Sequence, residues 1–150
     1  MAATWPGVSG VGTGFVIEPG HPNTIAPGKR PMHTLMPSLA MRGGRCAMAF
    51  GVMGADFQPV GQAHLITNMV DYGMDIQQAI DAPRAFYADE TTEVERGVSE
   101  ETVAGLKARG HDVALRRMPH GGGQDIVVDW ETGVLIGGSD HRKDGCAIGY

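Results

Sequence analysis

The sequence lacks the features that mark several classes of protein. None of its apolar runs approaches the roughly 20 residues of a membrane-spanning helix, and residues 1–12 lack the charged start and apolar centre of a signal peptide. It has no run of basic residues, and a net charge of −5 with a pI near 5.6 argues against a nucleic-acid partner. We therefore expect no membrane and no nucleic acid as partners; the missing signal favours the cytoplasm without deciding the compartment.

Reactive side chains are also scarce. The two cysteines, Cys46 and Cys146, match no metal or redox spacing, and we expect small buried or half-buried side chains. The six histidines form no cluster with other ligands at suitable spacing, so we expect no metal and no cofactor. No Gly-x-Ser-x-Gly elbow is present, and neither cysteine has a nearby activating base. If the protein is an enzyme, its nucleophile lies outside these residues.

The composition is typical of one globular domain rich in sheet. Hydrophobic residues make up 42% of the 150 and charged residues 19%, which excludes disorder. The 23 glycines and 9 prolines favour few helices and long connections. Residues 1–12 show no periodicity, so we expect an irregular N-terminal segment there and a single domain over residues 13–150.

Periodicity and turn signals predict two β-hairpins and three helices. Gly43-Gly44 is typical of a type I′ hairpin turn, and Asp56 and Ser99 are expected to cap helices. Strand patterns cover residues 13–18, 37–41, 46–53, 84–88, 92–95, 111–115, 124–128 and 134–138, with a last short strand at the C-terminus. Helical patterns cover residues 57–72, 75–81 and 99–109.

The first candidate site is the loop between Pro27 and Pro37. Prolines at 27, 31 and 37 fix φ and remove backbone donors, so the loop presents its side chains at little entropic cost. His33 and Thr34 are its only neutral hydrogen-bonding side chains. Because the loop leads straight into the first hairpin, these two residues are candidates for binding.

The second candidate is the strand-to-helix turn Gly51-Val-Met-Gly54-Ala55-Asp56. A helix N-terminus reached through glycine exposes unpaired N–H groups beside a positive dipole end, which suits an oxyanion or a carboxylate. The alternative, a turn without further function, stays open. The glycines at 121–123 lack the Lys and Ser/Thr of a phosphate loop, so we interpret them as a flexible lead into the second hairpin.

Several segments resemble the γ-glutamyltransferase (γ-glutamyltranspeptidase) family. The match begins near Gly14 and follows the family's order to Tyr150. The segments that carry it are Pro27-Gly-Lys-Arg-Pro-Met-His-Thr-Leu-Met-Pro37, Asn68-Met-Val-Asp-Tyr-Gly-Met, Gln78-Ala-Ile-Asp-Ala-Pro-Arg84, Gly105-Leu-Lys-Ala-Arg-Gly-His111 and Gly137-Gly-Ser-Asp-His-Arg-Lys-Asp-Gly145.

The resemblance implies a fold and a partner. In that family a precursor cleaves itself to expose an N-terminal threonine, which is the nucleophile and its own base, on a light chain that pairs with a heavy chain. Its fold is the α+β, four-layer αββα sandwich of N-terminal-nucleophile hydrolases, of which this chain is expected to supply the C-terminal light-chain part. The partner is then a heavy chain or an upstream light-chain segment, and the chain alone is expected to be inactive. A half-sandwich exposes an apolar sheet face, so we also expect an oligomer.

The resemblance also assigns site residues, position by position. The family's adjacent serines, which help to hold the substrate carboxylate, correspond to His33 and Thr34. Its Gly-Gly pair, whose backbone N–H groups form the oxyanion hole, corresponds to Gly54 and Ala55. These four residues are the predicted substrate-binding and catalytic positions.

The implied activity is acyl transfer or hydrolysis of a γ-glutamyl or related small-molecule amide through an acyl-enzyme. The family's acidic residue that binds the α-amino group corresponds to Thr13 or Gly14, neither of which is acidic. The acylase or small-amide hydrolase branch of the family is therefore an alternative. A further alternative is a catalytically inactive, truncated remnant that serves as a structural or interaction module.

Overall fold

The computed structural model describes residues 19–20, 27–28 and 33–150. The chain divides into two compact units, Met1–Thr34 and Leu35–Tyr150. In the first unit the described residues are two turns, at 19–20 and 27–28, and the exposed pair His33 and Thr34. The predicted irregular segment 1–12 and the predicted strand 13–18 lie outside the described residues.

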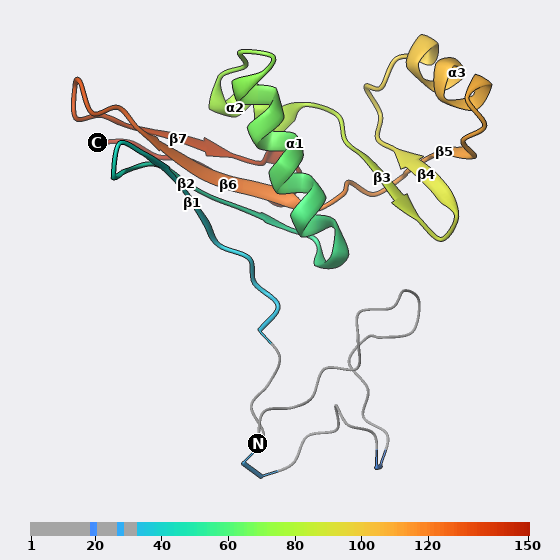
Figure 1. The fold of residues 1–150 in the computed structure, drawn as a ribbon, viewed down its shortest axis with the longest axis horizontal. Helices are drawn as coiled ribbons and strands as arrows, with labels where there is room; N and C mark the ends of the chain where they lie inside the picture. Colours follow the sequence, from blue (N-terminus) through green and yellow to red (C-terminus); the bar gives the residue numbers. More distant parts are fainter. Residues whose placement is uncertain (1–18, 21–26, 29–32) are drawn as a thin grey trace. The chain divides into compact units, whose positions relative to one another are not determined.

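The second unit contains a four-stranded antiparallel sheet with the order β1-β2-β6-β7 (Figure 1). Its strands are β1 (Ser38–Arg42), β2 (Arg45–Met53), β6 (Gly122–Val128) and β7 (Leu135–Ser139). Gly43 and Gly44 join β1 to β2 with φ values of 57° and 78°. Positive φ at both central residues defines the type I′ turn, so the predicted first hairpin is confirmed. The second hairpin, β6 to β7, is confirmed as well.

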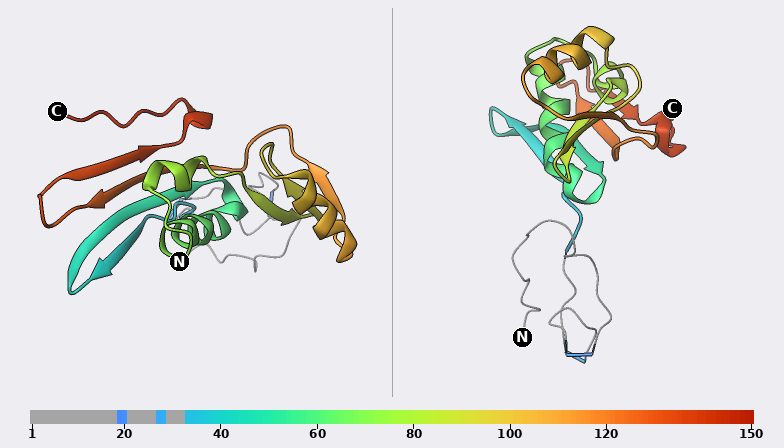
Figure 2. Two further views of the ribbon diagram at one scale, coloured as in Figure 1. Left: turned by 90° about the horizontal axis from the view of Figure 1, so that it is seen from above. Right: turned by 90° about the vertical axis from the view of Figure 1, so that its right-hand side faces the viewer.

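Two helices, α1 (Gln58–Val70) and α2 (Ile76–Asp81), lie on one face of this sheet (Figure 2). The core between the layers is a cluster of five buried residues: Met48, Leu65, Ile76, Ala79 and Ile80. Side chains alternate along a strand, so the neighbours of the core positions point to the opposite face. Leu39, Ile126 and Leu135 are exposed there. The predicted exposed apolar sheet face is therefore present.

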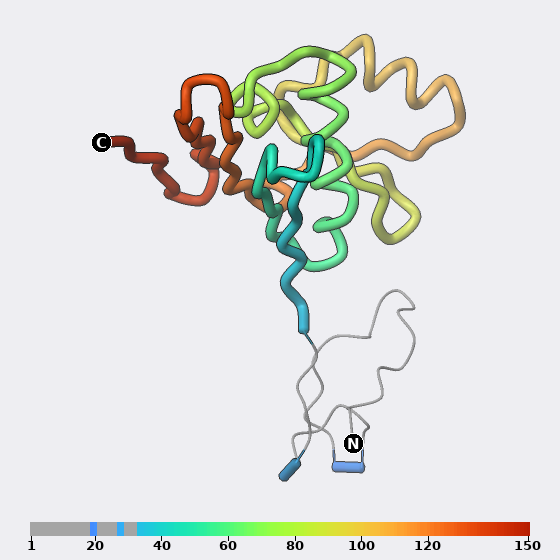
Figure 3. Tube along the Cα trace, turned by 60° about the vertical axis from the view of Figure 1, so that its left-hand side comes forward, coloured from blue at the N-terminus to red at the C-terminus, as the bar shows by residue number. Residues whose placement is uncertain are grey.

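A smaller three-stranded sheet, of order β3-β4-β5, forms a lobe with helix α3 (Figure 3). Its strands are β3 (Ala85–Ala88), β4 (Thr91–Val94) and β5 (Val113–Leu115), and α3 (Glu100–Ala108) joins the parallel pair β4 and β5. The Ser99 hydroxyl accepts the Thr102 N–H at 3.1 Å at the start of α3. Gly110 follows the helix with φ 90°, so both predicted end signals are confirmed.

Three local predictions are wrong. Asp56 does not cap α1; it lies inside a 3₁₀ helix, η1 (Ala55–Phe57), whose N-cap is Gly54. The C-terminal residues 145–150 form no strand and follow a second 3₁₀ helix, η2 (His141–Lys143). Cys146 is exposed, whereas Cys46 is half-buried as expected. In the described residues no helix is both long and apolar enough to cross a bilayer.

Candidate functional site

The corner between β2 and α1 is the predicted strand-to-helix turn. β2 ends at Met53, Gly54 turns the chain with φ 130°, and Ala55 follows in the left-handed region with φ 50°. The Phe57 N–H donates to the Gly54 carbonyl at 3.0 Å and closes the first turn of η1. The chain therefore passes from strand to helix through two backbone conformations that L side chains rarely adopt.

This corner presents two unused backbone donors. The first N–H groups of a helix have no intrahelical acceptor. Within the part of the chain that the structure describes, the N–H groups of Gly54 and Ala55 donate to no backbone or side-chain acceptor. Two neighbouring donors of this kind can stabilise the negative oxygen of a tetrahedral intermediate.

Gly121 packs directly against the corner. A Cβ on Gly54 would lie 2.9 Å from the Gly121 Cα, and a Cβ on Gly121 would lie 2.0 Å from the Met53 carbonyl oxygen. Gly121 also has φ 57°. Both positions therefore require glycine, and the interpretation of residues 121–123 as a flexible lead is wrong, because Gly122 and Gly123 are buried within β6.

An aromatic cluster supports the corner from inside. Phe57 is buried, its ring stacks on His120 with centroids 5.2 Å apart, and Phe86 packs edge-on against both. Burial, together with the positive charge of Arg116, lowers the pKa of His120 below its usual value. The imidazole is therefore neutral at pH 7 and packs as an aromatic ring.

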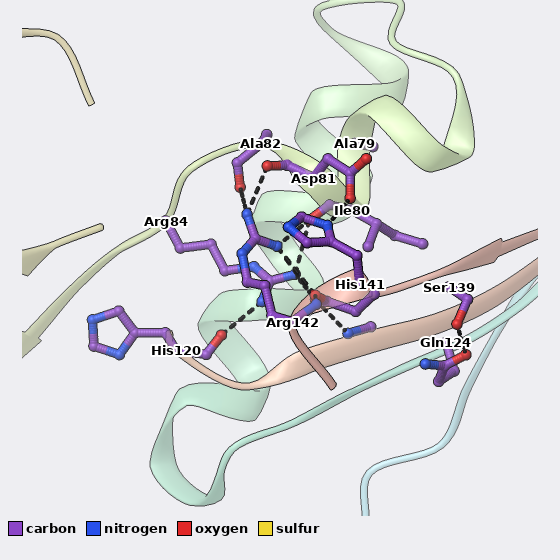
Figure 4. Close-up of polar contacts among 12 residues, drawn as sticks. Ala79, Ile80, Asp81, Ala82, Arg84, His120, Gln124, Ser139, His141 and Arg142 are labelled. Carbon is purple, nitrogen blue, oxygen red and sulfur yellow. Dashed lines mark hydrogen bonds and ion pairs between the residues drawn. The ribbon is translucent and has the colours of Figure 1, made fainter. Parts of the chain in front are cut away.

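A buried arginine holds the segment that carries His120 (Figure 4). One guanidinium nitrogen of Arg84 donates to the His120 carbonyl at 2.7 Å, and the other donates to Asp140 Oδ2 at 2.6 Å and to the Ile80 carbonyl at 2.9 Å. The Glu95 carboxylate accepts the backbone N–H of His120 at 2.6 Å and that of Arg84 at 3.2 Å. Both backbone polar groups of His120 are thus bonded to buried charged side chains.

Asp140 completes the charge cluster. It is fully buried and also accepts the backbone N–H groups of Gly123, at 3.1 Å, and Arg142, at 2.9 Å. Burial alone would raise the pKa of Asp140, but the hydrogen bonds from Arg84 and the Arg142 N–H outweigh burial and lower it. Asp140 is therefore ionised at pH 7 and pairs with Arg84.

A second buried carboxylate lies on β6. Asp125 Oδ1 accepts the Gly51 N–H at 3.0 Å, whereas Oδ2 has no hydrogen-bond partner among the described residues. Burial raises the pKa of Asp125 to about 6, although the Gly51 N–H opposes the shift. In the pairing of β2 with β6, Asp125 lies opposite Phe50, four residues before Gly54.

The two predicted pairs fall in different units. Gly54 and Ala55 are adjacent at the corner, in the second unit, and His33 and Thr34 end the first. Met36 follows Thr34 by two residues, and its carbonyl accepts a hydrogen bond from the Gln62 side chain on α1. That His33 and Thr34 bind substrate, and that Gly54 and Ala55 form an oxyanion hole, stay predictions.

Sequence reasoning missed the residues that support the corner, which are Gly121, Arg84, Glu95 and Asp140. Arg84 and Asp140 lie within two of the segments that carry the family resemblance, and that is the one signal that could have singled them out. No group of three or more His, Cys, Asp or Glu side chains among the described residues could hold a metal ion. Two open grooves lie on the second unit, and Gly54 and Ala55 line neither of them.

The described residues have an α+β fold of the N-terminal-nucleophile hydrolase type, and comparisons identify the family. The sequence model of the family "Gamma-glutamyltranspeptidase" matches residues 5–150. The chain therefore belongs to the γ-glutamyltranspeptidase family.

Named relatives differ in activity. The chain is 38% identical over 146 residues to the glutathione hydrolase-like YwrD proenzyme of Bacillus subtilis, covering 92% of this chain and 28% of that protein. It is 33% identical over 150 residues to the oxamate amidohydrolase proenzyme of Klebsiella pneumoniae, and this match covers 93% of this chain and 28% of that protein. The crystal structure of cephalosporin acylase from Bacillus halodurans superposes with a TM-score of 0.71 at 34% identity, covering 87% and 25%. The chain thus spans less than a third of the length of these relatives.

Proposed function

We propose that the complete protein transfers or hydrolyses a γ-glutamyl or related small-molecule amide through an acyl-enzyme. The observation that carries this proposal is the Gly54–Ala55 corner, where two adjacent backbone N–H groups at a helix start have no acceptor among the described residues. Membership of a family that includes glutathione hydrolases and amidohydrolases supports the reaction class.

The corner would act when the amide carbonyl is attacked. A threonine hydroxyl, supplied from outside these 150 residues, adds to the carbonyl carbon, and the carbonyl oxygen becomes negative. The α-amino group of the same threonine takes the hydroxyl proton, and the Gly54 and Ala55 N–H groups donate to the negative oxygen. The C–N bond then breaks as that proton passes to the leaving nitrogen, and the amine departs. Water or a second amine attacks the resulting ester, and the same donors stabilise the second tetrahedral intermediate. Removal of one such donor costs about 3 kcal/mol of transition-state stabilisation.

His33 and Thr34 are proposed to bind polar groups of the substrate. Both are exposed, and each offers a neutral hydrogen-bonding side chain suited to a carboxylate or an amide. The bond between the Met36 carbonyl and Gln62 fixes the point where the loop joins the helix layer.

A heavy chain or an upstream light-chain segment is proposed as the partner that covers the exposed face of the four-stranded sheet. Leu39, Ile126 and Leu135 leave an apolar sheet face uncovered, and such a face normally packs against another layer. The relatives named as proenzymes support a partner formed by processing. In this arrangement residues 13–150 are the light-chain part, and the 150-residue chain alone is inactive.

A specific observation favours the small-amide branch as the second candidate. The chain resembles an oxamate amidohydrolase and a cephalosporin acylase at 33% and 34% identity. Its His33 and Thr34 stand where a γ-glutamyl-specific member has two serines, and Thr13 or Gly14 stands in place of an acidic residue. The preferred substrate would then be an amide whose acyl group has no free α-amino group.

The test begins with the coding sequence upstream of Met1. An in-frame segment with a processing threonine supports the enzyme, whereas a stop codon with no partner gene favours the inactive remnant. The complete precursor is then assayed with γ-glutamyl-p-nitroanilide and with oxamate, beside the 150-residue chain. We expect turnover of one amide class by the precursor and none by the chain. Clear turnover by the chain alone would contradict the external nucleophile.

A further inference from the structure

We propose that Arg84 and Glu95 are positioning residues that set the geometry of the Gly54–Ala55 donors through the backbone of His120 and Gly121. Neither side chain hydrogen-bonds Gly54 or Ala55; the Arg84 guanidinium lies over the Phe57 ring, 6.0 Å from its centroid. The effect on turnover depends on the function proposed above, whereas the effect on the position of the two amides does not.

The first step is the double attachment of His120. Its carbonyl accepts from Arg84 at 2.7 Å, and its N–H donates to Glu95 at 2.6 Å. Hydrogen bonds to charged groups are about twice as strong as neutral ones, and these two lie in a buried environment. These two hydrogen bonds therefore restrict movement of the His120 backbone.

The second step is the contact between Gly121 and the corner. Gly121 follows His120 directly, and its Cα faces Gly54 so closely that a single added carbon would overlap. Interiors packed at this density transmit displacements because there is no void to absorb them. A movement of the His120 carbonyl therefore moves Gly121, and Gly121 moves Gly54.

The third step is the anchoring of Arg84 itself. The guanidinium also donates to the fully buried Asp140 at 2.6 Å and to the carbonyl of Ile80 at the end of α2, as Figure 4 shows for the labelled Arg84 and Ile80. Glu95 accepts the backbone N–H of Arg84 as well. Arg84 thus connects the corner to α2 and to Asp140, the residue that follows β7. These two parts of the core are distant from each other in sequence.

Arg142 supplies a matched control in the same cluster. It donates to the carbonyls of Ile80, Asp81 and Ala82 and to Asp140, and it forms an ion pair with Glu95 Oε2 at 3.6 Å that lysine can keep, but it makes no bond to His120. A general loss of stability should follow from changes at either arginine. Displacement of the Gly54 and Ala55 amides should follow only from changes at Arg84 or Glu95.

The experiment compares Arg84→Lys, Glu95→Gln and Arg142→Lys. Lysine keeps the charge but cannot bond His120, Asp140 and Ile80 with one planar fork. In Glu95→Gln the side chain keeps one acceptor oxygen and loses the other without a change of shape. This variant therefore tests the proposal if Arg84→Lys does not fold. Backbone amide chemical shifts of Gly54, Ala55 and Gly121 are measured in the ¹⁵N-labelled 150-residue chain. The values of kcat and KM are measured in the complete precursor after processing.

We expect Arg84→Lys and Glu95→Gln to shift all three amides and to lower kcat, by up to about a hundredfold for a displacement near 1 Å, with KM nearly unchanged. Arg142→Lys should leave the shifts and kcat close to those of the parent. Unchanged amide shifts in a folded Arg84→Lys or Glu95→Gln variant would overturn the proposal. Changed amide chemical shifts with an unchanged kcat would support the positioning role of Arg84 and Glu95. They would show instead that Gly54 and Ala55 do not form the oxyanion hole.

Discussion

Replacing Asp125 by asparagine is expected to stabilise the protein at neutral pH and to leave its stability at about pH 3 unchanged. Asp125 is 3% exposed, and within the described part of the chain only one of its two carboxylate oxygens has a partner, the Gly51 N–H. Burial disfavours the charged form and raises the pKa of Asp125 from 3.8 to about 6. The folded protein therefore holds this proton more tightly than the unfolded chain does.

The size and sign of the effect follow from proton linkage. Between pH 3.8 and about 6 the unfolded state loses the proton while the folded state keeps it, so stability falls as the pH rises through this interval. A difference of about two pKa units corresponds to roughly 3 kcal/mol at 1.36 kcal/mol per unit. Asparagine cannot ionise, and its Oδ1 can still accept the Gly51 N–H, so the variant avoids this loss.

The assay is urea unfolding of parent and variant, followed by far-UV circular dichroism at several pH values between about 3 and 8. The stability difference should grow from near zero to about 3 kcal/mol as the pH passes 6. A difference that does not vary with pH would refute the reasoning. Asp129→Asn is the control. The Thr132 hydroxyl and the Glu131 N–H lower the pKa of Asp129, so this substitution should lower the stability at neutral pH, whereas Asp125→Asn should raise it.

Gly54→Ala should lower kcat of the processed enzyme by about a hundredfold, because the added Cβ meets Gly121. The control is Gly133→Ala, where φ is 76° and the added Cβ meets nothing. Equal kcat values for the two variants would contradict the role of the corner. Asp75→Ala should cost about 1 kcal/mol in urea unfolding by removing the capping box of α2, whereas Asp56→Ala, which caps nothing, should be neutral. Leu39→Lys should weaken association in analytical ultracentrifugation if the exposed sheet face is the contact surface.

The parts of the fold that could be predicted from the sequence are those encoded by near neighbours. Gly43-Gly44 specifies its turn because both residues adopt positive φ, and Ser99 with Gly110 marks the two ends of α3. The α+β class and the family followed from segments spread over the whole chain. These signals act within a few residues or through a recognisable pattern, so no knowledge of the packing was needed.

The parts that could not be predicted depend on contacts between distant segments. Arg84 bonds a carbonyl 36 residues later and a carboxylate 56 residues later, and no spacing rule joins those positions. Asp56 was expected to cap α1, but the left-handed Ala55 inserts a 3₁₀ turn first. The role of Gly121 emerges only when Gly54 lies against it. The candidate donors were therefore predictable, whereas their support was not.

These contacts imply that the donors are in place before any partner arrives. Gly54 is confined by Gly121, and His120 is held by Arg84, all within the second unit. We therefore expect ¹⁵N order parameters near the rigid value of about 0.85 at Gly54 and Ala55 in the 150-residue chain, although neither amide has an acceptor among the described residues. Values as low as those of the solvent-exposed Gly43-Gly44 turn would show that the partner must build the corner. High values would mean that it adds only the nucleophile and the pocket walls.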